Sequence, residues 1–171
     1  TNFTFTDACR GTIIQLTDSS TSSAQSNLVT WQWQFGDTIT SSVQNPTHIY
    51  DTAGTYTITL ITIDDNGCLD SLQKSIHIFD TPTVYFTNTK ACSNSVITFT
   101  DSSYVNGGSI SNWSWNFGDG NTAAGTAQAQ NTYQLSAAYP VTLTATTSQG
   151  CIDSTTRLMV VDYSPSFQLL P

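Results

Sequence analysis

Apolar and polar residues alternate along much of this chain, which is the pattern of β-strands that bury one face. Tyr56, Ile58 and Leu60 alternate with threonines, and residues 31–35 alternate aromatic side chains with glutamine. Further strands are expected at 12–17 and 69–79, with a hairpin turn at 64–67. No segment has a helical period, so the sequence predicts an all-β fold.

The pattern occurs twice, at an offset of 83 residues that becomes 82 around the tryptophans. The recurring segments are 17–20 with 100–103, 31–37 with 113–119, 56–60 with 139–143, and 67–71 with 150–154. About seven short strands per repeat are typical of an immunoglobulin-like β-sandwich. We therefore expect two such sandwiches in tandem, arranged end to end. Their expected bounds are 1–81 and 82–164, with 165–171 as the start of a third repeat or a tail.

The amino-acid composition excludes several classes of function. The 171 residues include 12 acidic side chains, all Asp, and four cations, for a net charge of −8. Four cations cannot form the basic surface that nucleic-acid binding needs. No apolar run is long enough to insert into a membrane. No secretion signal is visible, so any such segment is expected to lie outside these residues.

The tryptophan motif and its surroundings resemble those of a known family. Trp-x-Trp-x-Phe-Gly-Asp at 31–37, Asn-Pro-Thr-His-Ile-Tyr at 45–50 and Gly-Thr-Tyr-Thr-Ile-Thr-Leu at 54–60 resemble the PKD (polycystic kidney disease) domain. The second copy keeps the tryptophan motif, but 128–133 departs from the second segment, which leaves its strand there less certain. The cysteine-bearing variant resembles PKD repeats in cell-surface adhesins and gliding-motility proteins of Bacteroidetes-type bacteria. That resemblance implies binding and spacing without catalysis.

Most conspicuous side chains are expected to be structural. The tryptophans could stack on sugars, but their shared parity with phenylalanine favours a core position. The expected core motif is Trp33, Phe35, Asp37, Tyr56, Trp115, Phe117, Asp119 and Tyr139. His48 is expected to pack locally, and His77 to face the polar side of its strand. No nucleophile motif, phosphate loop or dinucleotide fingerprint is present, so neither an enzyme nor a bound cofactor is expected.

The four cysteines occupy matching repeat positions, which suggests disulfides in an oxidising compartment. Pairing within each repeat would join Cys9 to Cys68 and Cys92 to Cys151. In a sandwich, however, these positions fall at opposite ends, too far apart for a bridge. We therefore favour an inter-domain Cys9–Cys151 bond, with Cys68 and Cys92 linking to neighbouring repeats, and keep the intra-domain pairing as the rival.

Two weaker site candidates remain. Asp64 and Asp65 supply the oxygen ligands that calcium prefers, although a solvated turn is the favoured explanation. Four Asp-Ser/Thr-apolar triplets resemble O-glycosylation acceptors of the same bacteria. Their acceptor residues are Thr38, Thr52, Ser71 and Ser154.

The sequence as a whole predicts an extracellular structural protein. We expect a spacer repeat of a long cell-surface adhesin or filament, which holds a functional tip away from the cell. Its expected partners are neighbouring repeats of the same chain or filament, and surface glycans or proteins, with no nucleic acid and no direct membrane insertion. The alternative is a carbohydrate- or protein-binding accessory module of a secreted hydrolase, whose contacts could come from loop 105–108.

Overall fold

The computed structural model describes residues 1–22 and 25–163, in which all regular structure is strand. The chain divides into two compact units, repeat 1 (Thr1–Asp80) and repeat 2 (Thr81–Pro171). The all-β fold and the tandem arrangement predicted from the sequence are confirmed. No helix that could span a membrane is found in the described residues. The segment 165–171, predicted to start a third repeat or form a tail, lies outside them.

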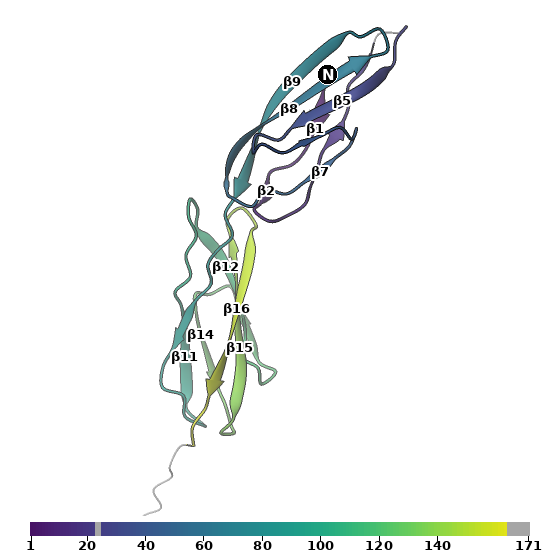
Figure 1. The fold of residues 1–171 in the computed structure, drawn as a ribbon. Coiled ribbons are helices and arrows are strands. Elements are labelled where there is room, and N and C mark those ends of the chain that lie inside the picture. The colour runs from purple at the N-terminus through teal and green to yellow at the C-terminus, as the bar shows by residue number, and fades with distance from the viewer. Residues whose placement is uncertain (23–24, 164–171) are drawn as a thin grey trace, which may run out of the picture. The chain divides into compact units, whose positions relative to one another are not determined.

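Repeat 1 packs one large sheet against two small ones. The large sheet has the order β2-β9-β8-β5-β6, and the pairs β1-β4 and β3-β7 form the opposite layer (Figure 1). Its strands are β1 (Phe3–Thr4), β2 (Ala8–Cys9), β3 (Ile14–Gln15), β4 (Thr17–Asp18), β5 (Leu28–Gln34), β6 (Thr40–Ser41), β7 (Thr47–His48), β8 (Gly54–Asp64) and β9 (Leu69–Phe79).

Repeat 2 has the same two layers, and the strand pairings of its smaller layer are longer than those of repeat 1. A four-stranded sheet of order β13-β12-β15-β16 faces a three-stranded sheet of order β10-β11-β14. Its strands are β10 (Phe86–Asn88), β11 (Val96–Asp101), β12 (Ile110–Asn116), β13 (Thr122–Ala124), β14 (Gln128–Thr132), β15 (Ala138–Thr147) and β16 (Ile152–Val160).

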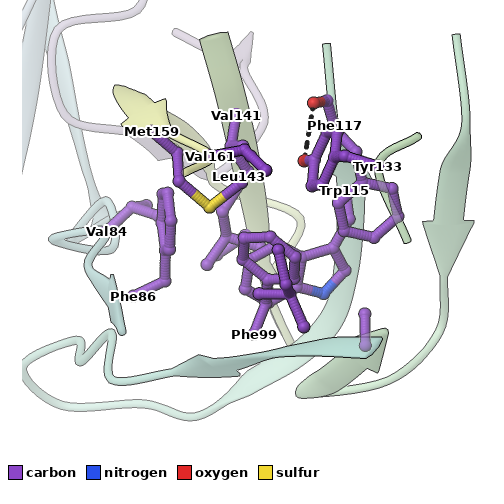
Figure 2. Close-up of a cluster of buried hydrophobic side chains, with 13 residues drawn as sticks. Val84, Phe86, Phe99, Trp115, Phe117, Tyr133, Val141, Leu143, Met159 and Val161 are labelled. Atoms are coloured by element: carbon purple, nitrogen blue, oxygen red, sulfur yellow. Dashed lines mark hydrogen bonds between the residues drawn. The ribbon is translucent and has the colours of Figure 1, made fainter. Parts of the chain in front are cut away.

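Each repeat has its own core, built from the inward-facing positions of both layers. In repeat 2, Trp115 and Phe117 of the β12 motif pack with Phe86 and Phe99 of the opposite sheet (Figure 2). In repeat 1, Trp33 lies against Phe3 at 5.1 Å between ring centroids. The alternation that predicted the strands therefore also selects the core residues.

The predicted strand 12–17 divides in two in repeat 1, and a proline explains why. Ile14 pairs with His48, and the same register places Leu16 opposite Pro46, which has no N–H to donate. Leu16 still donates to the Pro46 carbonyl, at 2.9 Å. The Leu16 carbonyl instead accepts the side-chain amide of Gln15, at 3.0 Å. The ladder is interrupted there, so β3 and β4 are separate short strands.

Repeat 2 has Ala129 in place of that proline, and its ladder is continuous. Ala129 pairs with Phe99, within a β14 of five residues that pairs along β11. The expectation that the altered segment 128–133 would make this strand less certain is therefore wrong. Loss of the proline restores a backbone donor, and the strand becomes longer than its counterpart β7.

A cation closes one side of each sandwich in the same way. Lys74 of β9 donates to the Phe3 carbonyl, and its ammonium lies 4.9 Å from the Phe3 ring centre. Arg157 of β16 donates to the Phe86 carbonyl at 2.7 Å, and its guanidinium carbon Cζ lies 5.5 Å from the Phe86 ring centre. Two of the four cations of the chain thus bind the edge strand of the opposite layer.

Candidate functional site

The second tryptophan of each motif is a core residue. Trp33 and Trp115 are both fully buried. Their indole N–H groups donate to backbone carbonyls, of Val43 at 2.9 Å and of Thr126 at 3.1 Å. Because these rings have no exposed face, they cannot serve as platforms for sugar stacking.

The first tryptophan of each motif is held by an aspartate from a strand of the opposite layer. The Trp31 indole N–H donates to Asp18 at 2.7 Å, and that of Trp113 donates to Asp101 at 2.8 Å. The other oxygen of each carboxylate accepts a backbone N–H two residues further on, from Ser20 or Ser103. This brace explains why Thr-Asp-Ser-Ser and Trp-x-Trp recur together, and their joint recurrence is the sequence signal of the contact.

The Asp18 brace predicts a loss of stability in acid. Burial raises the pKa of Asp18, but hydrogen bonds from Ser20, Gln44 and Trp31 outweigh it and hold the pKa below 3.8. Its contribution is therefore present above the unfolded-state pKa and is lost as the pH falls through the lower folded-state value. We expect Asp18→Asn to destabilise repeat 1 by about 1 kcal/mol at pH 7.

Amide hydrogen exchange of repeat 1 peptides at pH 7, and chemical denaturation from pH 7 down to pH 2, measure this effect. The gap between Asp18→Asn and the wild type should close in acid, because the wild-type carboxyl is then protonated. A gap that stays constant over this range would contradict the proposed ionic brace.

The motif aspartate takes a different partner in each repeat. In repeat 1, Asp37 contacts His48 Nε2 at 2.7 Å, and the buried imidazole stacks on Phe35 at 4.1 Å. In repeat 2, Asp119 accepts a hydrogen bond from Asn131 at 2.8 Å, and Asn131 occupies the position equivalent to His48. Both partners fix the turn that carries the aspartate, so His48 has a local structural role.

Two buried tyrosines hold the same turn from inside. The hydroxyl groups of Tyr50 and Tyr133 donate to the carbonyls of Phe35 and Phe117, at 2.7 and 2.8 Å. The sequence also places Tyr56 and Tyr139 in the core motif, and both are partly buried. Their ring centroids lie 4.2 Å from that of Tyr50 and 4.3 Å from that of Tyr133, respectively.

The buried Tyr133 predicts a loss of stability in alkali. Burial, with the nearby Asp119 and Tyr139, raises the pKa of Tyr133 to about 12, although a hydrogen bond with Asn131 opposes the shift. A raised phenol pKa contributes stability that is present below the unfolded-state value of 10 and is lost as the pH rises towards 12. Tyr133→Phe should cost about 1 kcal/mol at pH 7 through the lost hydrogen bond. It should also flatten the decline of repeat 2 stability between pH 10 and 12, measured by chemical denaturation.

The cysteines of one repeat lie at opposite ends of its last strand. Cys9 pairs with Phe79, the last residue of β9, whereas Cys68 immediately precedes its first residue. Ten residue steps along a strand span about 33 Å, far beyond the limit of about 7 Å between the Cα atoms of a disulfide. In repeat 2, Cys92 bridges to Asp162 beyond the end of β16, and Cys151 precedes that strand. The rival intra-domain pairings are incompatible with this geometry.

The oxidation states differ between the matching positions. Cys9 and Cys151 are disulfide-bonded, whereas Cys68 is an exposed free thiol and Cys92 a partly exposed one. The sequence-based pairing of Cys9 with Cys151, and of the other two with neighbouring repeats, stays a prediction.

The two calcium candidates, Asp64 and Asp65, accept backbone hydrogen bonds at the hairpin turn. Asp64 accepts the backbone N–H groups of Asn66 at 3.0 Å and Cys68 at 2.8 Å, and the bond from Cys68 is the main reason its pKa is lowered. Asp65 accepts the backbone N–H of Asn27 at 3.2 Å. Residues 1–22 and 25–163 hold no group of three or more potential metal-ligating side chains. A calcium role for this turn stays a prediction.

The four glycosylation candidates are all on the surface. Thr38, Thr52, Ser71 and Ser154 are exposed. Ser71 and Ser154 occupy equivalent positions, and the backbone N–H of each donates to the preceding aspartate. Exposure is necessary for modification, which stays a prediction. His77 is exposed, as its alternation with buried isoleucines predicts, and its Nδ1 contacts Thr55 Oγ1 at 3.0 Å.

The comparisons with known proteins match both sandwiches to one domain type. A family model described as PKD domain matches residues 3–79 and again 80–161. Pre-pro-metalloprotease PrtV of Vibrio cholerae is 37% identical over 67 residues, which are 39% of this chain and 7% of that protein. Collagenase ColA of Bacillus cereus is 35% identical over 69 residues, which are 40% of this chain and 7% of that protein. The matched region thus spans only a small part of these curated relatives.

Solved structures of single domains are similar to parts of this chain. The PKD1 domain of Vibrio anguillarum Epp is 22% identical, with a TM-score of 0.47, and the match covers 50% of this chain and 99% of that one. The PKD1 domain of Vibrio cholerae metalloprotease PrtV is 27% identical, with a TM-score of 0.44, and the match covers 48% of this chain and 98% of that one. Because the family model covers both repeats almost completely, this chain belongs to the PKD domain family.

Proposed function

We propose that this chain is a non-catalytic extracellular spacer, a tandem unit of a cell-surface adhesin or filament. The observation that carries the proposal is that the same polar braces recur in both repeats. Each aspartate–tryptophan pair, each buried tyrosine hydroxyl and each edge cation holds the sandwich together. Because these polar side chains form hydrogen bonds within the sandwich and not with a ligand, they suit a module whose role is to stay rigid.

An extracellular location is supported by the relatives and by the cysteines. The similar proteins include a metalloprotease and collagenases of bacteria. The disulfide state of Cys9 and Cys151 fits an oxidising compartment. A net charge of −8 keeps such chains soluble and mutually repelling. Attachment to a cell surface is part of the proposal and is supported by the repeat character of the chain.

The spacer role includes a covalent link between successive repeats, formed by Cys9 and Cys151. The two cysteines within one repeat are about 33 Å apart, so neither can pair inside its own sandwich. Cys68 and Cys151 share one repeat position and Cys9 and Cys92 the other, so each copy would offer one cysteine to each neighbour. On this scheme the free Cys68 and Cys92 are partners for preceding and following repeats.

Peptide mapping under non-reducing conditions tests this link. We expect one disulfide-linked peptide that contains Cys9 and Cys151, while Cys68 and Cys92 react with N-ethylmaleimide before reduction. All four thiols should react after reduction. A peptide joining Cys9 to Cys68, or Cys92 to Cys151, would overturn the scheme.

Small-angle scattering of the 171-residue chain tests the mechanical consequence. The oxidised protein should give a narrow distribution of interatomic distances. Cys151→Ser should broaden it, because only the linker then connects the repeats. Cys68→Ser is the matched control and should leave the curve unchanged. Identical curves for the oxidised protein and Cys151→Ser would show that the bond does not stiffen the tandem.

A second candidate function is an accessory module of a secreted hydrolase. It is favoured by the relatives, which are named as a metalloprotease and collagenases and of which this kind of domain forms a small part. The full gene product distinguishes the two. Further copies at 83-residue spacing favour the spacer, and a catalytic domain beside a few copies favours the accessory module.

A further inference from the structure

Two tyrosines of repeat 2 lie exposed on one face of the three-stranded sheet. Tyr85 precedes β10 and Tyr104 follows β11, and each side chain is 55% exposed. Among residues 1–22 and 25–163, neither hydroxyl has a hydrogen-bond partner. By contrast, the hydroxyls of Tyr50, Tyr56 and Tyr133 are all hydrogen-bonded.

Strand register places these two tyrosines side by side. The β10–β11 ladder pairs Phe86 with Asp101, and the bridge between Thr83 and Tyr104 continues the same register. Tyr85 is therefore opposite Ser102, whose N–H donates to the Tyr85 carbonyl at 2.9 Å. Tyr85 and Tyr104 are diagonal neighbours on one face, with Cα atoms about 7–8 Å apart.

The outward positions of β10, β11 and β14, as the structure describes them, carry hydroxyl and amide groups together with the exposed Val96, and no charged side chain. Thr100 of β11 faces outward and contacts Gln128 of β14, and Thr98 contacts Gln130 in the same way. Thr87 of β10 is also exposed. The nearby Asp101 points inward to Trp113. A ligand on this face would therefore meet two aromatic rings beside neutral hydrogen-bonding groups.

Repeat 1 shows that the tyrosines are not required by the fold. At the positions equivalent to Tyr85 and Tyr104 it has Asn2 and Thr21, and the corresponding outward face carries the exposed Ile13 and Ile49 beside polar side chains. The sandwich forms in both cases. Two large rings that are each more than half exposed and lie next to each other on one surface favour a binding role.

We infer that this face of repeat 2 binds a neutral saccharide. The C–H face of a sugar ring stacks on an aromatic ring, and its hydroxyl groups pair with threonine and glutamine side chains. The uncharged surface gives a phosphate, sulfate or carboxylate group no counter-charge. The inference does not depend on the spacer role, because the face belongs to one repeat and involves none of the cysteines.

Affinity electrophoresis of the 171-residue chain in native gels tests this inference. The probes are the neutral polysaccharides laminarin, xylan and galactomannan, with alginate as the anionic comparison. We expect at least one neutral polysaccharide to retard the wild type. Tyr85→Asn combined with Tyr104→Thr, which installs the residues of repeat 1, should raise the dissociation constant at least tenfold. Tyr163→Thr removes another exposed tyrosine of the same repeat and should bind as the wild type does.

Three outcomes would overturn the inference. They are no retardation by any of the three neutral polysaccharides, retardation by alginate alone, and equal retardation of the wild type and the double variant. Circular dichroism verifies that the double variant is folded. If it is not, the single variant Tyr104→Thr decides in its place, with a dissociation constant at least threefold above that of the wild type as the supporting result.

Discussion

Trp33→Ala should unfold or nearly unfold repeat 1 while leaving repeat 2 intact. The Trp33 side chain is fully buried, packs against Phe3 and donates its indole N–H to Val43. Replacing a core tryptophan by alanine costs about 3–5 kcal/mol. A domain of this size has a stability of about 4–12 kcal/mol, so this one substitution removes much or all of it.

Hydrogen exchange followed by mass spectrometry measures the loss separately for each repeat. Peptides of repeat 1 should lose protection in Trp33→Ala, and peptides of repeat 2 should keep it. Trp115→Ala should give the reverse result. Gln32→Ala, at an exposed neighbouring position on the same strand, is the matched control and should change stability by less than about 0.5 kcal/mol. Similar losses for Gln32→Ala and Trp33→Ala would contradict the assigned core.

The strands with strong alternation were predictable because one rule governs them. In β8, Ile58 and Leu60 are buried, whereas Thr57 is exposed and Thr59 partly exposed. The sequence-based bounds 69–79 for the returning strand coincide with β9. A side-chain period of two is visible in sequence, and one buried face is enough to produce it.

Strand length on the other layer was not predictable from alternation, because backbone hydrogen bonds decide it. Leu16 is buried as the pattern requires, yet the ladder stops beside it because Pro46 offers no donor. By sequence, Ala129 at the position of Pro46 is a departure from the family motif. Its physical effect was the gain of a donor and a longer strand.

The contacts of the candidate site were less predictable than the fold, because they join residues that no periodic pattern connects. The aspartate–tryptophan braces join residues about a dozen positions apart, such as Asp18 and Trp31, and only their joint recurrence signals a contact. Tyr85 and Tyr104 give no periodic signal at all, since repeat 1 lacks them. They could be found only after the register showed that both rings share one face.

Gly118→Ala should destabilise repeat 2 far more than alanine at another glycine of the same backbone conformation. Gly118 has φ +78°, and a Cβ there would lie 2.7 Å from the Pro140 carbonyl oxygen and 2.8 Å from Pro140 Cδ. Gly150 has φ +84°, but a Cβ there would meet nothing within 4 Å. A left-handed conformation costs about 1–2 kcal/mol for alanine, and forced overlap adds about 1–3 kcal/mol.

We therefore expect a loss of about 2–5 kcal/mol for Gly118→Ala and about 1–2 kcal/mol for Gly150→Ala, from chemical denaturation of repeat 2. Gly36→Ala should reproduce the larger effect in repeat 1, because its Cβ would lie 2.8 Å from the Thr57 carbonyl oxygen. Equal losses at Gly118 and Gly150 would mean that conformation alone explains the glycine. A larger loss at Gly118 would show that the Gly-Asp step of the motif exists because β12 must turn directly against the backbone of β15.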